Sequence, residues 1–270
     1  MPPLSTAHKA AVTSFVSITG SNDRIAQRYL KNTGYRLNEA IDVYFQTNSN
    51  TSANTIRDTQ LAKLFDSLRN AQEDPPDALG ADSSMLYLQS IGVDLEGASL
   101  FLAMELVQAP TIGEITREGF VKGWKNAGVV EPRIDAQRNH FKQLTNELSS
   151  NPSLFRKVYR YAFVVGREGD QRALSLDNAI LYWEMLFKKP GQVWVGSTGR
   201  IDWLSEWIAF LREKWTRSVS RDMWNQTLEF AFKSIEDETL GFWSQDGAWP
   251  GVIDDFVAWY KHKSEMDVDA

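Results

Sequence analysis

From Ile56 onward the apolar residues recur at the spacing of an α-helix, and no run alternates apolar and polar residues as a strand would. Leu61, Leu64, Phe65 and Leu68 form the first apolar stripe. Further helices are predicted around residues 85–88, 100–107, 120–124, 141–148, 152–165, 176–187, 202–215, 220–238 and 250–262. The sequence therefore predicts an all-α fold.

The N-terminal residues predict a separate, small domain of three short helices. Ser5 is placed to cap the first helix, and Ser21 and Asn22 are placed to cap the second. The second helix ends at Thr33-Gly34-Tyr35, because glycine readily adopts the left-handed conformation that follows a helix C-terminus. Such a short segment makes a core close to the lower size limit for independent folding.

A polar tract separates these two regions. Residues 48–56 consist mainly of Asn, Ser and Thr and have little to bury, which predicts a flexible linker. We therefore expect a three-helix domain at residues 5–47, a linker at 48–56, a larger helical domain at 57–263 and a frayed tail at 264–270.

The chain contains no cysteine, which excludes disulfides, Cys-ligated zinc, iron–sulfur clusters and any thioester mechanism that runs through this chain. His8, His140 and His262 lie far apart, and none has a partner at metal-ligand spacing. No Gly-x-Ser-x-Gly elbow and no glycine-rich phosphate loop is present. We therefore expect no catalytic residue, metal or cofactor, and a protein that works by binding other proteins.

Targeting signals are also missing from the sequence. No apolar run approaches the roughly 20 residues that are needed to span a bilayer. The N-terminus lacks the basic and apolar regions of a secretory signal. We expect no membrane partner, and a location in the cytoplasm, the nucleus or both.

Charge is distributed unevenly along the chain, whose net charge is −6. Residues 201–270 contain 14 acidic and 7 basic residues, whereas residues 1–200 contain 21 acidic and 22 basic residues. An acidic C-terminal region argues against nucleic acid as the main ligand and favours a basic protein surface. A solvated acidic face that keeps the protein in solution explains the same balance equally well.

Two predicted helix–loop–helix junctions, at residues 74–82 and 166–175, have the arrangement of calcium-binding EF-hands. Neither loop offers oxygen ligands at positions 1, 3, 5 and 12 of one register. We therefore expect two EF-hand-like halves that keep the geometry without calcium ligands.

One apolar stripe has two interpretations. It is typical of a core, but it also fits a cleft between helices that admits an apolar anchor from a partner. The stripe consists of Leu88, Leu100, Ala103, Met104, Val107 and Ile115.

Two acidic residues near the C-terminus also have a structural explanation. Asp222 and Asp254 each lie in the first turn of a predicted helix, where the macrodipole favours an acidic side chain by ~0.3–1 kcal/mol. Pro250 is the matching first-turn proline. This explanation does not account for the turn at residues 247–250, which presents Ala248 and a tryptophan beside the two helix starts.

These C-terminal motifs resemble a known family. Leu176 to Trp183, Arg221 to Asn225, Asp246 to Pro250 and Ile253 to Val257 are together similar to the defective-in-cullin-neddylation proteins, whose C-terminal domain is called the potentiating-neddylation or PONY domain. The resemblance covers about residues 57 to 263. The N-terminal module resembles a ubiquitin-associated (UBA) domain, with Thr33-Gly34-Tyr35 in place of the usual loop.

The resemblance implies a co-ligase that helps attach a ubiquitin-like modifier to a lysine of a cullin. The surface for the cullin C-terminal winged-helix region would be Asp222, Ala248 and Asp254. An apolar pocket would take the acetylated N-terminal Met of the neddylation conjugating enzyme, and it would include Leu88, Leu100, Ala103, Met104, Val107, Ile115, Val165, Tyr182 and Met185. Ubiquitin or a related modifier would contact Thr33, Gly34, Tyr35 and Val43.

A non-catalytic role is consistent with this resemblance, because the reactive cysteine belongs to the conjugating enzyme. The alternative is a UBA-containing ubiquitin receptor or adaptor that has no effect on the rate of transfer. A cullin-modification assay with and without the protein separates the two functions. A calcium sensor is a third interpretation, and the missing loop ligands weaken it.

Overall fold

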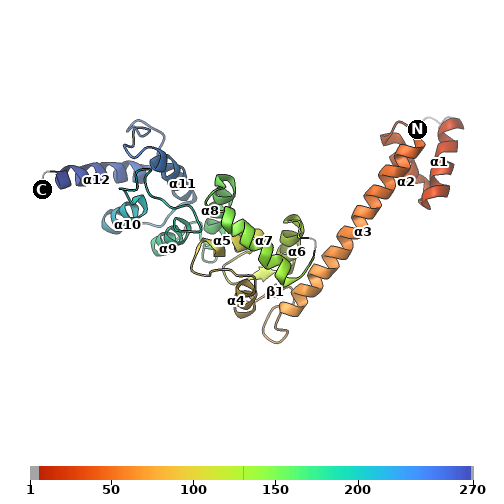
Figure 1. Ribbon diagram of the computed structural model, residues 1–270, viewed down its shortest axis with the longest axis horizontal. Coiled ribbons are helices and arrows are strands. Elements are labelled where there is room, and N and C mark those ends of the chain that lie inside the picture. Colours follow the sequence, from red (N-terminus) through yellow and green to blue (C-terminus); the bar gives the residue numbers. More distant parts are fainter. Residues whose placement is uncertain (1–5, 130, 269–270) are drawn as a thin grey trace. The chain divides into compact units, whose positions relative to one another are not determined.

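The computed structural model describes residues 6–129 and 131–268, without the side chains of residues 6, 48–54 and 266–268. Within these ranges the chain is helical apart from loops and two short strands, which confirms the all-α prediction (Figure 1). The elements in chain order are α1 (Thr6–Thr19), α2 (Asp23–Asn32), α3 (Leu37–Leu68), β1 (Ala78–Leu79), α4 (Ala81–Ser90), α5 (Ala98–Leu106), β2 (Ile115–Thr116), α6 (Arg117–Asn126), α7 (Ile134–Glu147), α8 (Pro152–Val165), α9 (Leu176–Leu186), α10 (Trp203–Lys214), α11 (Arg221–Glu236) and α12 (Gly251–Val268).

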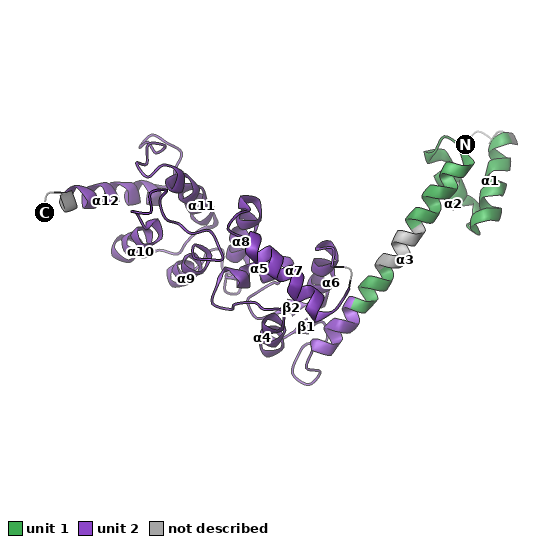
Figure 2. Ribbon diagram, viewed as in Figure 1, with its two compact units in different colours: residues 1–60 green, residues 61–270 purple. Residues whose placement is uncertain are grey.

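The chain divides into two compact units, residues 1–60 (unit 1) and residues 61–270 (unit 2) (Figure 2). Helix α3 belongs to both, since its last turns lie in unit 2. None of the described helices has the length and apolar character that crossing a membrane would require.

Unit 1 contains α1, α2 and the first part of α3, as the sequence predicts. Asn22 caps α2 by accepting a hydrogen bond from the backbone N–H of Ile25 at 3.0 Å. Tyr44 of α3 meets the rings of Phe15 and Tyr29 edge-on, each at 5.4 Å between ring centroids. These aromatic contacts join all three helices around a small core of Val12, Phe15, Ala26, Leu30 and Ala40.

Two expectations about the ends of these regions need correction. Helix α3 runs through residues 48–56, where we expected a flexible linker, and α12 continues to Val268 through most of the expected tail. Neither segment contains glycine or proline, so nothing interrupts helical hydrogen bonding once the helix has started. The predicted cap at Ser5 and the last two residues of the tail lie outside the described residues.

The core of unit 2 is rich in aromatic residues. Trp224 of α11 stacks between Tyr159 of α8, at 4.5 Å, and Trp183 of α9, at 5.1 Å between ring centroids. The indole of Trp183 donates to the Tyr159 hydroxyl at 2.7 Å, and that hydroxyl donates to the Trp224 carbonyl at 2.9 Å. Burial raises the pKa of the Tyr159 hydroxyl well above its usual value, so it stays a neutral donor. This stack links α8, α9 and α11 in the core.

Short strand pairings organise unit 2 into two EF-hand-like halves. In the first, β1 pairs antiparallel with β2, and Leu79 lies opposite Ile115. In the second, Leu174 and Val219 exchange backbone hydrogen bonds of 2.9 and 3.0 Å. Each pairing joins a loop that the sequence identified to a second loop that it did not. No group of three or more His, Asp or Glu side chains able to hold a metal ion occurs among the residues that the structure describes.

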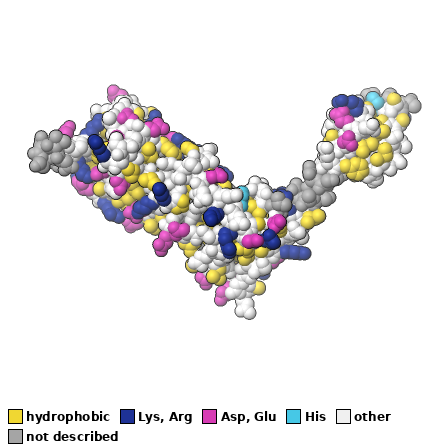
Figure 3. Space-filling model, viewed as in Figure 1, with side chains coloured by type: hydrophobic (Ala, Val, Ile, Leu, Met, Phe, Trp, Pro, Cys, Tyr) yellow, Lys and Arg dark blue, Asp and Glu magenta, His cyan; other side chains and the backbone are white. Residues whose placement is uncertain are grey.

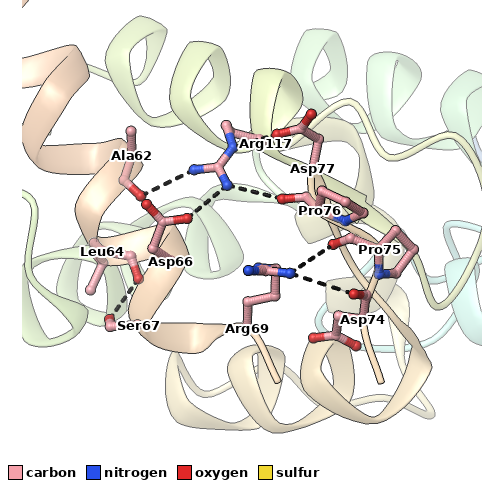
Figure 4. A network of polar contacts seen from close by, with 10 residues as sticks. All are labelled: Ala62, Leu64, Asp66, Ser67, Arg69, Asp74, Pro75, Pro76, Asp77 and Arg117. Atoms are coloured by element: carbon pink, nitrogen blue, oxygen red, sulfur yellow. Dashed lines mark hydrogen bonds and ion pairs between the residues drawn. The ribbon is translucent and has the colours of Figure 1, made fainter. Parts of the chain in front are cut away.

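An arginine network fixes the end of α3 to the first half (Figure 4). Arg117, at the start of α6, donates to Asp66 of α3 at 2.7 Å and to Asp77 at 2.8 Å. Asp74, in the loop proposed as EF-hand-like, accepts from the backbone N–H groups of Asn70 and Gly80. That carboxylate therefore closes the loop between α3 and α4 through backbone hydrogen bonds.

Candidate functional site

The predicted cullin patch lies where α11 and α12 begin. Ser220 caps α11 by accepting from the backbone N–H of Met223 at 3.1 Å, which places Asp222 in the first turn. Asp222 is exposed. Gly251 starts α12 directly after Pro250.

A groove of about 510 Å³ runs between these two helix starts. Asp222 and Asp255 both line it, together with Trp215, Arg217 and Met223. We call it the α11–α12 groove. Asp255 is the acidic residue that shares a groove with Asp222, and sequence reasoning missed it. The motif contains the pair Asp254-Asp255, and because adjacent helical residues point about 100° apart, only Asp255 lines this groove.

Asp254 has a different environment from the one we expected. It is only half exposed, and its Oδ1 accepts a hydrogen bond from the indole of Trp243 at 2.9 Å. The ammonium of Lys261 lies 4.8 Å from the centre of the Trp243 ring. Asp254 therefore holds the loop before α12 in place.

Ala248 sits at the exposed tip of that same loop. The following residue, Trp249, turns inward and meets Phe230 and Phe242 at 5.8 and 6.0 Å between ring centroids. Trp249 thus explains the Gly-Ala-Trp-Pro turn in structural terms: the tryptophan anchors the loop while the alanine stays accessible.

The residues predicted to line the acetyl-methionine pocket are buried. All nine are at most 9% exposed, and Met104 and Ile115 are completely buried. The ring of Tyr182 meets Phe101 edge-on at 5.0 Å and lies so close to Gly166 that any side chain there would collide with it. Burial and the nearby Glu168 raise the pKa of Tyr182, so its hydroxyl is neutral. In this structure, the apolar stripe is therefore part of the core.

Large apolar side chains are nevertheless exposed close to this region. Met85 and Leu86 of α4 are 44% and 68% exposed, and Ile112 is exposed in the loop before β2. That loop is close to α4, because a side-chain carbon at Gly113 would contact Ala81. Leu88 of the same helix is buried, because successive helical positions cannot all face one core.

The predicted ubiquitin surface of unit 1 is only partly available. Gly34 and Tyr35 both have a φ of 61°, and Tyr35 stacks on His8 at 3.6 Å between ring centroids. Val43 is 39% exposed, and Figure 3 shows hydrophobic side chains on the visible face of unit 1. Thr33 is buried, and its hydroxyl donates to carbonyls of α2, so its role is to end that helix. Thr33 is therefore removed from the contact surface.

Comparison with known proteins places these sites in a family. Residues 136–259 match the family model described as Cullin binding, and residues 9–51 match the one described as a UBA-like domain. Defective in cullin neddylation protein 1 of Pyricularia oryzae is 43% identical over 284 residues, which cover 99% of this chain and 100% of that protein. The chain belongs to the defective-in-cullin-neddylation family. The family protein of Yarrowia lipolytica is 29% identical over 91% of this chain and 94% of its own length.

Within this defective-in-cullin-neddylation protein, the two matches fall on different units. The UBA-like match lies in unit 1, and the cullin-binding match contains Asp222, Ala248, Asp254 and Asp255. A more distant member, DCN1-like protein 5 of Bos taurus, is 29% identical over 69% of this chain and 73% of its own length.

Proposed function

We propose that this protein promotes the neddylation of cullins, and that it binds the C-terminal winged-helix region of the cullin at the start of α11 and α12. The observation that carries the proposal is the α11–α12 groove, where Asp222 and Asp255 lie open to a basic partner inside the segment that matches the cullin-binding model. Family membership supports the same conclusion.

The proposed mechanism is that the protein positions its two partners relative to each other. No cysteine is present in the sequence, so the modifier cannot pass through a thioester on this protein. A helper that holds the cullin and the loaded conjugating enzyme together converts an encounter between two molecules into a reaction within one complex. The protein is thus a non-catalytic ligase cofactor.

The second partner in this proposal is the conjugating enzyme, whose acetylated N-terminal Met would enter among Leu88, Leu100, Met104 and Val107. These side chains are buried, so the pocket forms only when they move apart. Met85 and Ile112 are exposed and offer an apolar surface for the initial contact with such a peptide. Acetylation favours entry, because a free amine would have to shed water in an apolar site.

Unit 1 is proposed to bind ubiquitin or a related modifier through Gly34, Tyr35 and Val43. Phe45 is also exposed, at 46%, two residues from Val43 on α3. This contact increases local concentration and is not needed for positioning the cullin.

The deciding experiment is cullin modification in vitro with purified enzymes. Wild-type protein should accelerate transfer, Asp222→Lys should not, and Asp222→Lys should keep the wild-type circular dichroism spectrum because the residue is exposed. If wild-type protein leaves the rate unchanged while it binds ubiquitin, the alternative function of ubiquitin receptor or adaptor is correct. The location in the cytoplasm, the nucleus or both stays a prediction.

A further inference from the structure

A second groove lies beside the α11–α12 groove, between α10 and α12. Its volume is about 740 Å³, and its walls include Phe210 and Ala258. Glu213 and Asp255 are its acidic members, and Lys214, His262 and Lys263 also line it. We call it the α10–α12 groove. Asp255 lines both grooves, so they are adjacent and share this one side chain.

The aromatic wall of the α10–α12 groove is held in a fixed orientation. The indole N–H of Trp259 donates to Oε2 of Glu213 at 3.0 Å. The Trp259 ring also packs against Phe210 at 5.8 Å and Phe256 at 6.3 Å between ring centroids. A partner side chain would therefore meet a preformed surface, and little ordering would be needed on this side.

Two of the protein's own lysines line this groove and contact its acidic and aromatic side chains. Lys214 pairs with Oε1 of Glu213 at 2.8 Å, and Lys263 places its ammonium 5.3 Å from the centre of the Trp259 ring. Lys263 is also held by Glu206 at 2.7 Å. The hydrogen bonds from Lys214 and Trp259 lower the pKa of Glu213, so it is ionised at neutral pH.

The Glu213–Lys214 pair can be exchanged at low cost. Both side chains are about half exposed, and exposed ion pairs of this kind contribute little to stability. A cation from a partner can therefore replace Lys214 at Glu213 while its aliphatic stem lies against the Trp259 ring.

We propose that the α10–α12 groove is a second contact for the cullin C-terminal region, and that it receives a lysine or arginine side chain between Trp259, Glu213 and Asp255. This inference rests on the proposed function. It extends the cullin surface from the starts of α11 and α12 along the length of α12, on the side that faces α10.

The test measures binding of a cullin C-terminal fragment to the full chain by calorimetry. Ala258→Arg adds bulk and positive charge at an exposed helical position without removing a contact, and Ala258→Ser is its control. Glu213→Gln removes the acidic partner, and Glu236→Gln, at an exposed position of α11 outside both grooves, is the matched control. Ala258→Arg should weaken binding about tenfold and Glu213→Gln about threefold, with both controls close to wild type.

Asp222→Lys, measured in parallel, distinguishes this inference from the proposed function. If Ala258→Arg and Glu213→Gln bind like wild type while Asp222→Lys binds poorly, the second contact is wrong and cullin binding at the α11–α12 groove stands. If Glu236→Gln weakens binding as much as Glu213→Gln, the effect is one of general charge and the second contact is again wrong. If Asp222→Lys also binds like wild type, both proposals fail.

Discussion

The α11–α12 groove is open at the surface, whereas the predicted acetyl-methionine pocket is closed. Asp222 and Asp255 line an open groove on the surface. The nine pocket residues are buried in the core of unit 2, and Met104 has no exposed surface. In the proposed function, the cullin docks on a surface that already exists, whereas binding of the conjugating enzyme costs free energy because buried side chains must first move apart.

The largest expected effect is a loss of stability when a charge is placed among the buried pocket residues. Met104→Asp places a charge in the core and should lower the free energy of unfolding by about 4 kcal/mol or more, measured by urea denaturation with tryptophan fluorescence. Asp222→Lys, the surface control, should change that free energy by less than about 0.5 kcal/mol. Equal stability of Met104→Asp and wild type would mean that the pocket is already open.

The next effect concerns the acetyl group. A free N-terminal ammonium loses its hydration on entering an apolar pocket, so the acetylated peptide of the conjugating enzyme should bind about 100-fold more tightly, or about 3 kcal/mol. Fluorescence anisotropy with the two peptides measures this ratio, and an acetylated peptide with its Met replaced by Gln is the control. Similar affinities for acetylated and free peptides would contradict the proposed pocket.

At the open groove the expected effect is smaller, because water still reaches the charges. Asp222→Lys should weaken the cullin complex by about 2 kcal/mol, or roughly thirtyfold in Kd, through loss of attraction and new repulsion. Calorimetry with a cullin C-terminal fragment checks it, with Asp222→Asn expected between mutant and wild type. An unchanged Kd for Asp222→Lys would remove this groove from the cullin surface.

The smallest expected effects distinguish the role of Asp254 from that of the adjacent Asp255. Asp254→Ala removes the acceptor for Trp243 and should lower the free energy of unfolding by about 1 kcal/mol. Asp255→Ala removes the same helix-dipole contribution without that hydrogen bond, and should instead weaken cullin binding about fivefold. Thermal unfolding and calorimetry on both variants test the assignment; the reverse pattern would return Asp254 to the contact surface and make Asp255 structural.

Helix positions were predictable because they depend on local periodicity and on caps. Helix α8, for example, starts at Pro152 as expected. Asn151 caps it by accepting from the backbone N–H of Leu154 at 3.1 Å. The pairing of Leu79 with Ile115, and of Leu174 with Val219, was not predictable, since it joins segments that are distant in sequence. The same limit explains why only one loop of each EF-hand-like half was identified.

The sequence placed the candidate site residues within motifs, but it could not predict the environment of each side chain. The motif identified the start of α12, yet only the structure shows that Asp254 bonds to Trp243 while Asp255 lines both grooves. Thr33 likewise belongs to the UBA-like loop but is buried by its own helix end. Side-chain direction depends on packing against distant segments, and that information is absent from a single stretch of sequence.

The distribution of tryptophan gives this protein a built-in optical reporter. All ten tryptophans lie in unit 2, so their fluorescence follows that unit without a signal from unit 1. The stacked pair Trp183 and Trp224 will report loss of the core. Trp215 and Trp259, which line the two grooves, will change their emission when a partner covers them. Unfolding and cullin docking can therefore be followed on the unlabelled chain.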